Sequence, residues 1–125
     1  MKITIEVSVG ELYDKISILR IKQNKLTNPS QLVNVNKELK YLESKAFNND
    51  PTVTVLVDQL YLINLELWDI ENAKRECEAK KDFGDKFIQL ARDVYIKNDM
   101  RAKLKKQINK ITLSDVIEEK DYTSY

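Results

Sequence analysis

The sequence predicts a mainly α-helical protein, an antiparallel four-helix bundle with a short N-terminal β-strand. Three observations predict this fold class. Apolar residues recur at alternating spacings of three and four over four long stretches, which is the period of an amphipathic helix. The 125 residues include only 2 Gly and 2 Pro, and most of these fall between the stretches. The connections are short, which favours antiparallel neighbours, and the length favours a single domain over residues 1–125.

The first expected element is a short strand over residues 2–7. Its β-branched residues alternate with polar ones: Ile3, Ile5 and Val7 against Thr4 and Glu6. A period of two is typical of a strand, and a lone strand needs a partner. We therefore expect pairing with the C-terminal tail, residues 112–125, although the tail could instead form a short turn or be disordered.

Two helices are expected next, over about 9–26 and 31–47. Ser8 and Glu11 match the S-x-x-E capping box, which marks the start of the first helix. Its stripe is spaced 4-3-4-3 and forms one face of a packed helix: Leu12, Ile16, Leu19, Gln23 and Leu26. The run 28–30, Asn-Pro-Ser, separates the two helices, and Ser30 is the expected N-cap of the second.

The two longest helices are expected over about 51–81 and 85–110. Asp50 and Pro51 suit the N-cap and the first helical position, and Gly84 lies in the turn between the helices. Between residues 56 and 68 the chain is apolar nearly all round, which indicates burial on more than one side. The expected core consists of Leu12, Ile16, Leu19, Leu39, Leu42, Leu56, Leu60, Ile63, Leu67, Ile70, Phe87, Ala91 and Val94.

The composition excludes most catalytic mechanisms. The chain has no histidine, which is the usual general base and the commonest metal ligand. Its one cysteine, Cys77, stands between two glutamates, which disfavour a reactive thiolate. Two glycines cannot build a phosphate-binding loop. Only carboxylate and metal chemistry stays open to an enzyme, so the sequence indicates binding or assembly rather than catalysis.

The charge balance and hydropathy limit the partners and the compartment. With 21 Lys+Arg and 20 Asp+Glu, the net charge of +1 creates no strong field for nucleic acid or an anionic membrane. No run of about 18 apolar residues could span a bilayer, and the first residues lack the pattern of a secretory signal. We expect a cytoplasmic protein with no nucleic-acid partner, no membrane partner and no resident cofactor.

The favoured function is that of a non-catalytic interaction or assembly protein. Leu62, Leu65 and Trp68 lie on the apolar back and flank of the helix over 51–81, away from its main stripe. Apolar surface in excess of what one core needs indicates an interface. We therefore expect a homo-oligomer, or a complex with a protein partner, formed through these three residues.

An alternative is an Mg²⁺-dependent hydrolase. Glu66 and Asp69 stand one helical turn apart and could hold the metal through oxygen ligands. All-α nucleoside-triphosphate pyrophosphohydrolases use paired acidic motifs of this kind, whereas only one such pair is present here. A solvated acidic edge explains the two carboxylates more simply.

The same alternative includes a binder of a small anion such as a nucleotide or a sugar nucleotide. Glu71, Asn98 and Arg101 lie on or beside the apolar stripes, and Arg101 could hold a phosphate or carboxylate with two hydrogen bonds. These residues could equally form a polar layer that fixes the register of the helices, which is the interpretation we favour.

Several stretches resemble a family of small uncharacterised bacterial and phage proteins. They are spread over nearly the whole chain: Glu6–Leu19, Leu67–Glu71, Phe87–Tyr95, Asn98–Lys105 and Glu118–Tyr122. The resemblance implies a complete bacterial or phage protein. It implies no activity, catalytic residue or cofactor.

Overall fold

The computed structural model describes all 125 residues, and it contains four α-helices and no β-strand. The helices are α1 (Val9–Lys25), α2 (Pro29–Glu43), α3 (Pro51–Ala79) and α4 (Asp85–Ile111). The all-helical class and the number of helices are confirmed, and the helix ends differ from those predicted by a few residues. No helix combines the length and the apolar character needed to cross a membrane.

Side-chain caps start three of the helices. The Ser8 hydroxyl accepts a hydrogen bond from the Glu11 amide at 3.1 Å, and the Asp50 carboxylate accepts one from the Thr52 amide at 2.9 Å. The expected cap of the second helix, Ser30, is wrong, because Asn28 accepts from the Ser30 amide at 2.9 Å. With Asn28 as the cap, Pro29 takes the first helical position, where its missing N–H has no cost.

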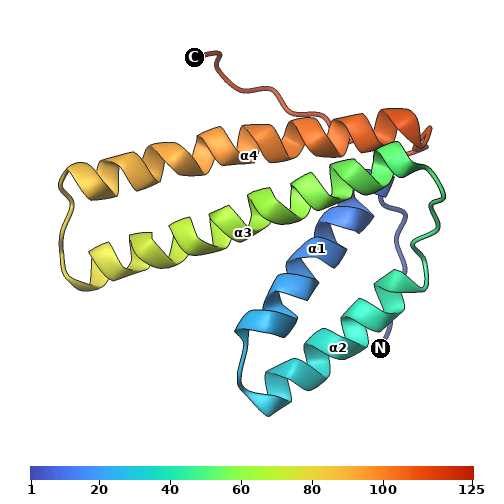
Figure 1. The fold of residues 1–125 in the computed structure, drawn as a ribbon, viewed down its shortest axis with the longest axis horizontal. Coiled ribbons are helices and arrows are strands. Elements are labelled where there is room, and N and C mark those ends of the chain that lie inside the picture. The colour runs from blue at the N-terminus through green and yellow to red at the C-terminus, as the bar shows by residue number, and fades with distance from the viewer.

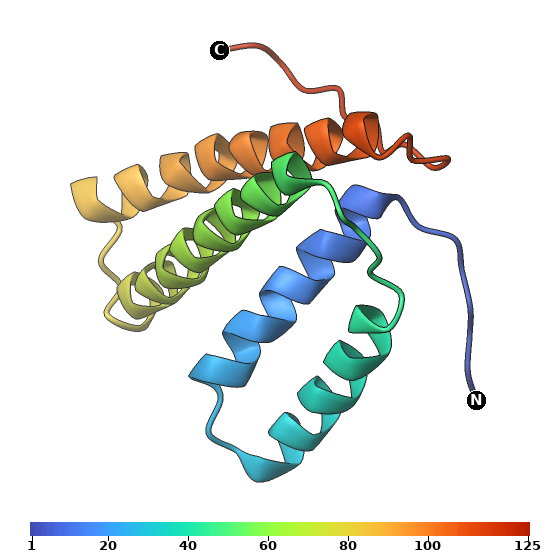
Figure 2. The ribbon, with the colours of Figure 1, turned by 45° about the vertical axis from the view of Figure 1, so that its right-hand side comes forward.

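The four helices form two antiparallel hairpins, α1–α2 and α3–α4, and α1 is the helix through which the hairpins contact each other. α3 and α4 lie side by side along their length, and the shorter pair of α1 and α2 joins them at an angle (Figure 1). α1 contacts the other three helices, whereas α2 contacts only α1. Figure 2 shows α2 standing apart from the long hairpin. The arrangement is therefore more open than the expected bundle.

The core is divided in the same way. Ile16 and Leu19 of α1 are buried against Val35 and Leu39 of α2, with Leu12 and Leu42 beside them. A second cluster joins α3 to α4 through a separate set of buried residues, Val53, Leu60 and Ile108, with Leu56 partly buried against it. Three expected core residues near the start of α4 are only partly buried: Phe87, Ala91 and Val94. At that end of the molecule α3 is the only helix that covers them.

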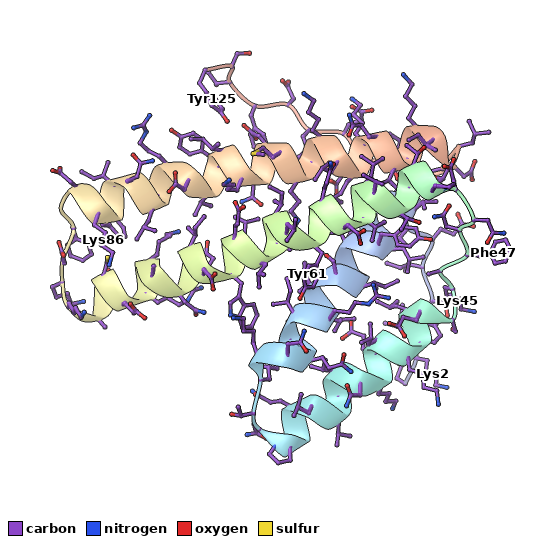
Figure 3. The ribbon with its side chains drawn as sticks, viewed as in Figure 1. Lys2, Lys45, Phe47, Tyr61, Lys86 and Tyr125 are labelled. Atoms are coloured by element: carbon purple, nitrogen blue, oxygen red, sulfur yellow. The ribbon has the colours of Figure 1, made fainter.

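The expected pairing of residues 2–7 with the C-terminal tail is wrong. The first segment runs beside α2, whereas the tail turns back along α4 (Figures 1 and 3). Tyr125 donates a hydrogen bond to Asp99 at 2.5 Å, and its ring packs edge-on against Tyr95 with centroids 5.2 Å apart. These contacts hold the tail on α4, out of reach of residues 2–7.

Gly10 marks the closest approach of α1 to α4. Its amide donates to Asn109 Oδ1 at 2.7 Å, and the neighbouring Val9 amide donates to Ser114 Oγ at 3.1 Å. A Cβ atom at position 10 would lie 2.6 Å from the backbone oxygen of Lys105. Only glycine therefore allows the start of α1 to reach this position.

We expect Gly10→Ala to lower the free energy of unfolding by about 1–3 kcal/mol, because the added methyl group meets backbone that cannot move aside. The clash outweighs the gain of about 1 kcal/mol in helix propensity. Urea denaturation followed by circular dichroism measures the change. Gly84→Ala is the matched control, since a Cβ there meets only Asp82 Oδ1 at 3.4 Å. A Gly10→Ala protein as stable as the Gly84→Ala protein would contradict the steric argument.

Candidate functional site

A buried carboxylate, Asp14 of α1, lies where α1 crosses α3 and α4. Only 1% of the residue is exposed. Arg101 of α4 donates from Nε to Asp14 Oδ1 at 2.9 Å and from Nη2 to Oδ2. Lys105 Nζ lies 3.8 Å from the same Oδ2. A bidentate arginine–carboxylate pair is geometrically specific, so it sets the position of α1 on α4.

The surroundings of Asp14 favour its charged form. Burial by itself would raise the pKa of this carboxyl. Hydrogen bonds from Arg101 and Asn64, together with the positive charges of Arg101 and Lys105, outweigh burial and lower the pKa. The hydrogen bond to Asp14 correspondingly raises the pKa of Arg101. The pair is therefore ionised at neutral pH.

Asn64 of α3 completes the crossing. Its Nδ2 donates to Asp14 Oδ1 at 2.9 Å and to Ser17 Oγ at 2.7 Å, and Ser17 Oγ donates to the Asp14 carbonyl at 2.8 Å. Because the carboxylate accepts only, the nitrogen of the amide must face it. Asn64 is 5% exposed, and its own carbonyl oxygen has no hydrogen-bond partner within the protein.

Lys105 extends the network toward the tail. The side chain is 8% exposed, and its Nζ donates to Glu11 Oε2 at 2.7 Å and to Glu118 Oε1 at 3.4 Å. Burial by itself would lower the pKa of Lys105, but its hydrogen bond to Glu11 and the charges of Asp14, Glu11 and Glu118 raise the pKa. Two cations thus face three carboxylates, so every buried charge has an opposite charge beside it.

A cavity of about 410 Å³ opens beside this network, between α1, α3 and α4. Polar side chains of α3 and α4 form part of its wall: Asn64, Glu71, Asn72, Arg75, Asn98 and Arg101. The remaining wall is apolar and comes from α1 and α3: Ile18, Ile21, Leu67 and Trp68. An apolar cavity with a few converging polar groups is typical of small-molecule sites.

The three residues suggested for an anionic ligand meet in this cavity. Arg101 Nη1 donates to Asn98 Oδ1 at 3.4 Å, a long hydrogen bond. Glu71 accepts from Arg75 Nη1 at 2.5 Å, and this bond, despite some burial, lowers the pKa of Glu71. From the sequence, a polar layer and a pocket are alternative interpretations of these polar residues. The structure contains both, since Asn64 and Arg101 belong to the hydrogen-bond network and also line the cavity.

The carboxylates suggested for Mg²⁺ lie elsewhere. Glu66 forms an ion pair of 2.5 Å with Lys97 of α4, and Asp69 is exposed on the outer side of α3. No three His, Cys, Asp or Glu side chains are grouped in a way that could hold a metal ion.

The three residues suggested for an interface do not share one surface. Leu62 is 57% exposed and lies in a groove between α3 and α4. Leu65 is half-buried, and Trp68 forms part of the cavity wall. Trp68 is six positions beyond Leu62, which places it about 120° around α3. It therefore lies on the side of α3 where Ile18 and Ile21 of α1 line the same cavity.

α1 has a second packed face, which carries Asp14 and Ser17 and which its apolar periodicity does not predict. The residues of this face are all buried against α3 and α4: Gly10, Asp14, Ser17 and Ile21. Their spacing of 4-3-4 is as regular as that of the apolar stripe. A glycine, an aspartate and a serine at these spacings indicate a packed face of the helix, which a search for apolar residues alone does not detect.

Acid should destabilise the protein through Asp14. Its pKa in the folded state is lowered from about 3.9, so its contribution is complete above that pH and is lost as the pH falls through the folded value. We expect Asp14→Asn to lower the free energy of unfolding at pH 7 by about 2–4 kcal/mol, since Arg101 keeps partial solvent access.

Urea denaturation between pH 2.5 and pH 7 tests this expectation. The Asp14→Asn protein should show a flatter dependence of stability on pH than the unmodified protein. Asp58→Asn, at an exposed position of α3, is the matched control and should retain the unmodified profile. Equal slopes for all three proteins would contradict the role given to Asp14.

Comparison with known proteins places the chain in a family. No curated protein and no solved structure matches it. A model described as "Family of unknown function (DUF6165)" matches residues 1–125, which confirms the resemblance to an uncharacterised family. Bacterial or phage origin stays a prediction. The chain, from its first residue to its last, belongs to the DUF6165 family.

Proposed function

We propose that this protein binds, without catalysis, a small polar molecule that carries an anionic group, in the cavity between α1, α3 and α4. One observation carries the proposal: Asn64, Asn98 and Arg101 converge on a single cavity that also contains Trp68. The polar groups come from two helices and are held in place by the buried Asp14 network. Preorganised groups of this kind lose little freedom when a ligand binds.

Each part of the cavity suits one part of such a ligand. The free carbonyl oxygen of Asn64 can accept from a hydroxyl or amide, and Arg101 Nη1, with only its long bond to Asn98, can donate to an anion. Arg75, exposed at the edge, neutralises the charge of Glu71 in the cavity wall, so the wall does not repel an anion. Trp68 and its apolar neighbours offer a surface for a ring. A nucleotide or a sugar nucleotide combines these features.

Binding should be detected as thermal stabilisation and as a change in fluorescence. The chain has one tryptophan, Trp68, so its emission reports on the cavity directly. A ligand at 100 times its dissociation constant should add about 2.7 kcal/mol to the stability. The probes are nucleoside mono- and triphosphates, sugar nucleotides and inorganic phosphate, each with and without Mg²⁺.

Arg75→Gln should weaken binding of the anionic probes about tenfold, because it removes an exposed positive charge and leaves the Glu71 carboxylate unpaired in the cavity wall. Lys86→Gln, at the far end of the long hairpin, is the matched control (Figure 3). A response that requires Mg²⁺ and disappears in the Glu66→Gln protein would support the metal-dependent alternative instead. The proposal is wrong if no probe changes either the melting temperature or the emission of Trp68.

Self-association through the outer side of α3 is a second candidate function. Leu62 is 57% exposed and Met100 is 45% exposed, and both border one groove between α3 and α4. Two large apolar side chains in one groove form a surface that a protein partner could cover. Of the three residues suggested for an interface, only Leu62 borders this groove.

We expect Leu62→Glu to shift the protein toward monomer in sedimentation velocity, because it places a charge in an apolar contact. Its effect on stability should be within about 0.5 kcal/mol, since the position is exposed. Val33→Glu, at an exposed position of α2 away from the groove, controls for the added charge. A protein that is monomeric at every concentration would contradict this candidate.

A further inference from the structure

Residues 2–7 are extended and make no hydrogen bonds within the chain. None of their backbone N–H or C=O groups is bonded, and neither Lys2 nor Glu6 forms an ion pair. Ile3 is 80% exposed and Ile5 is 73% exposed. Lys2, Ile3 and Thr4 line one side of a groove against α2, and the opposite side of the segment is uncovered (Figures 2 and 3). A strand-like segment with free backbone groups and exposed β-branched side chains is an open edge for another strand.

We propose that residues 2–7 pair with the same residues of a second copy, as a two-stranded antiparallel ribbon centred on Thr4. In this register Thr4 lies opposite Thr4, and Ile3 of each copy lies opposite Ile5 of the other. The isoleucines of both copies then share one face of the ribbon, because successive side chains of a strand point to opposite sides. Cross-strand pairs of β-branched residues stabilise such a ribbon.

Charge complementarity selects the second copy as the partner and sets the register. Around Thr4, Lys2 of each copy faces Glu6 of the other, so the ribbon contains two pairs of opposite charges. A parallel ribbon would place lysine beside lysine and glutamate beside glutamate, which is unfavourable. Moving the antiparallel register by two residues would oppose Lys2 to Ser8, which is buried as the cap of α1.

The ribbon should be a weak contact. It involves few residues on each side, which places it below the size of a stable interface, and a ribbon of two strands is marginal by itself. We therefore expect monomer and dimer to exchange at protein concentrations between about 10 μM and 1 mM. This surface is separate from Leu62 and from the cavity of the proposed function.

The first test removes the backbone pairing. In the proposed ribbon the two Thr4 residues form a hydrogen-bonded pair, in which each N–H donates to the carbonyl oxygen of the other copy. Thr4→Pro removes both of these hydrogen bonds and places its ring toward the partner strand, where proline is not accepted.

The test is made in the Leu62→Glu background, which removes the other candidate contact between copies. There we expect Thr4→Pro to sediment as a monomer up to 1 mM with an unchanged melting temperature, because Thr4 has no hydrogen bond in the single chain. Thr123→Pro, in the exposed tail and in the same background, is the matched control and should still dimerise. A Leu62→Glu protein that stays monomeric to 1 mM, or a Thr4→Pro variant of it that still dimerises, overturns the proposal.

The second test addresses the register. Lys2→Glu and Glu6→Lys should each weaken self-association about tenfold, since both charge pairs become repulsive. Mixing the two variants should restore dimers, now composed of one copy of each, because opposite charges meet again across the ribbon. Lys86→Glu carries the same charge change as Lys2→Glu, at a position far from the ribbon, and should leave self-association unaltered. The register centred on Thr4 is overturned if the mixture associates no better than the separate variants.

Discussion

The ionised pair of Asp14 and Arg101 is the interaction on which the rest of the structure depends. A carboxylate that is 1% exposed is tolerated only where partners replace the water it has lost. Arg101, Lys105 and Asn64 are those partners, and they come from both helices of the long hairpin. A shift of α1 by one residue would leave the charge without them. The register of α1 on α3 and α4 is therefore set by charge and hydrogen bonding as much as by apolar packing.

The position of α1 explains the open shape of the molecule and the location of the cavity. α1 has apolar residues against α2 on one face and Gly10, Asp14 and Ser17 against the long hairpin on the other. α2 is therefore attached to the rest through α1 alone. The cavity opens beside the crossing, so Asn64 and Arg101 serve both the fold and the candidate site. Binding at this cavity would be coupled to the stability of the crossing itself.

The candidate site could be predicted in part. Glu71, Asn98 and Arg101 stand out because polar residues on an apolar stripe need partners, and all three border the cavity. Asp14 was missed because it lies opposite the apolar stripe of α1, on the side that hydrophobicity alone assigns to solvent. Trp68 was grouped with Leu62, since both lie away from the main stripe. The structure separates them, because α1 covers only the side of α3 that carries Trp68.

The sequence by itself determined the helices, the caps Ser8 and Asp50 of two of them, and the three-four periodicity of their apolar faces, because these features depend on residues a few positions apart. It also determined that residues 2–7 have the alternation of a strand. Only the tertiary structure decided that Asp14 meets Arg101, that α1 packs on two sides and that residues 2–7 lack a partner in their own chain. The first two outcomes depend on neutralising a buried charge between residues 87 positions apart, and the third on contacts that hold the C-terminal tail on α4. Local periodicity carries no information about contacts between distant segments.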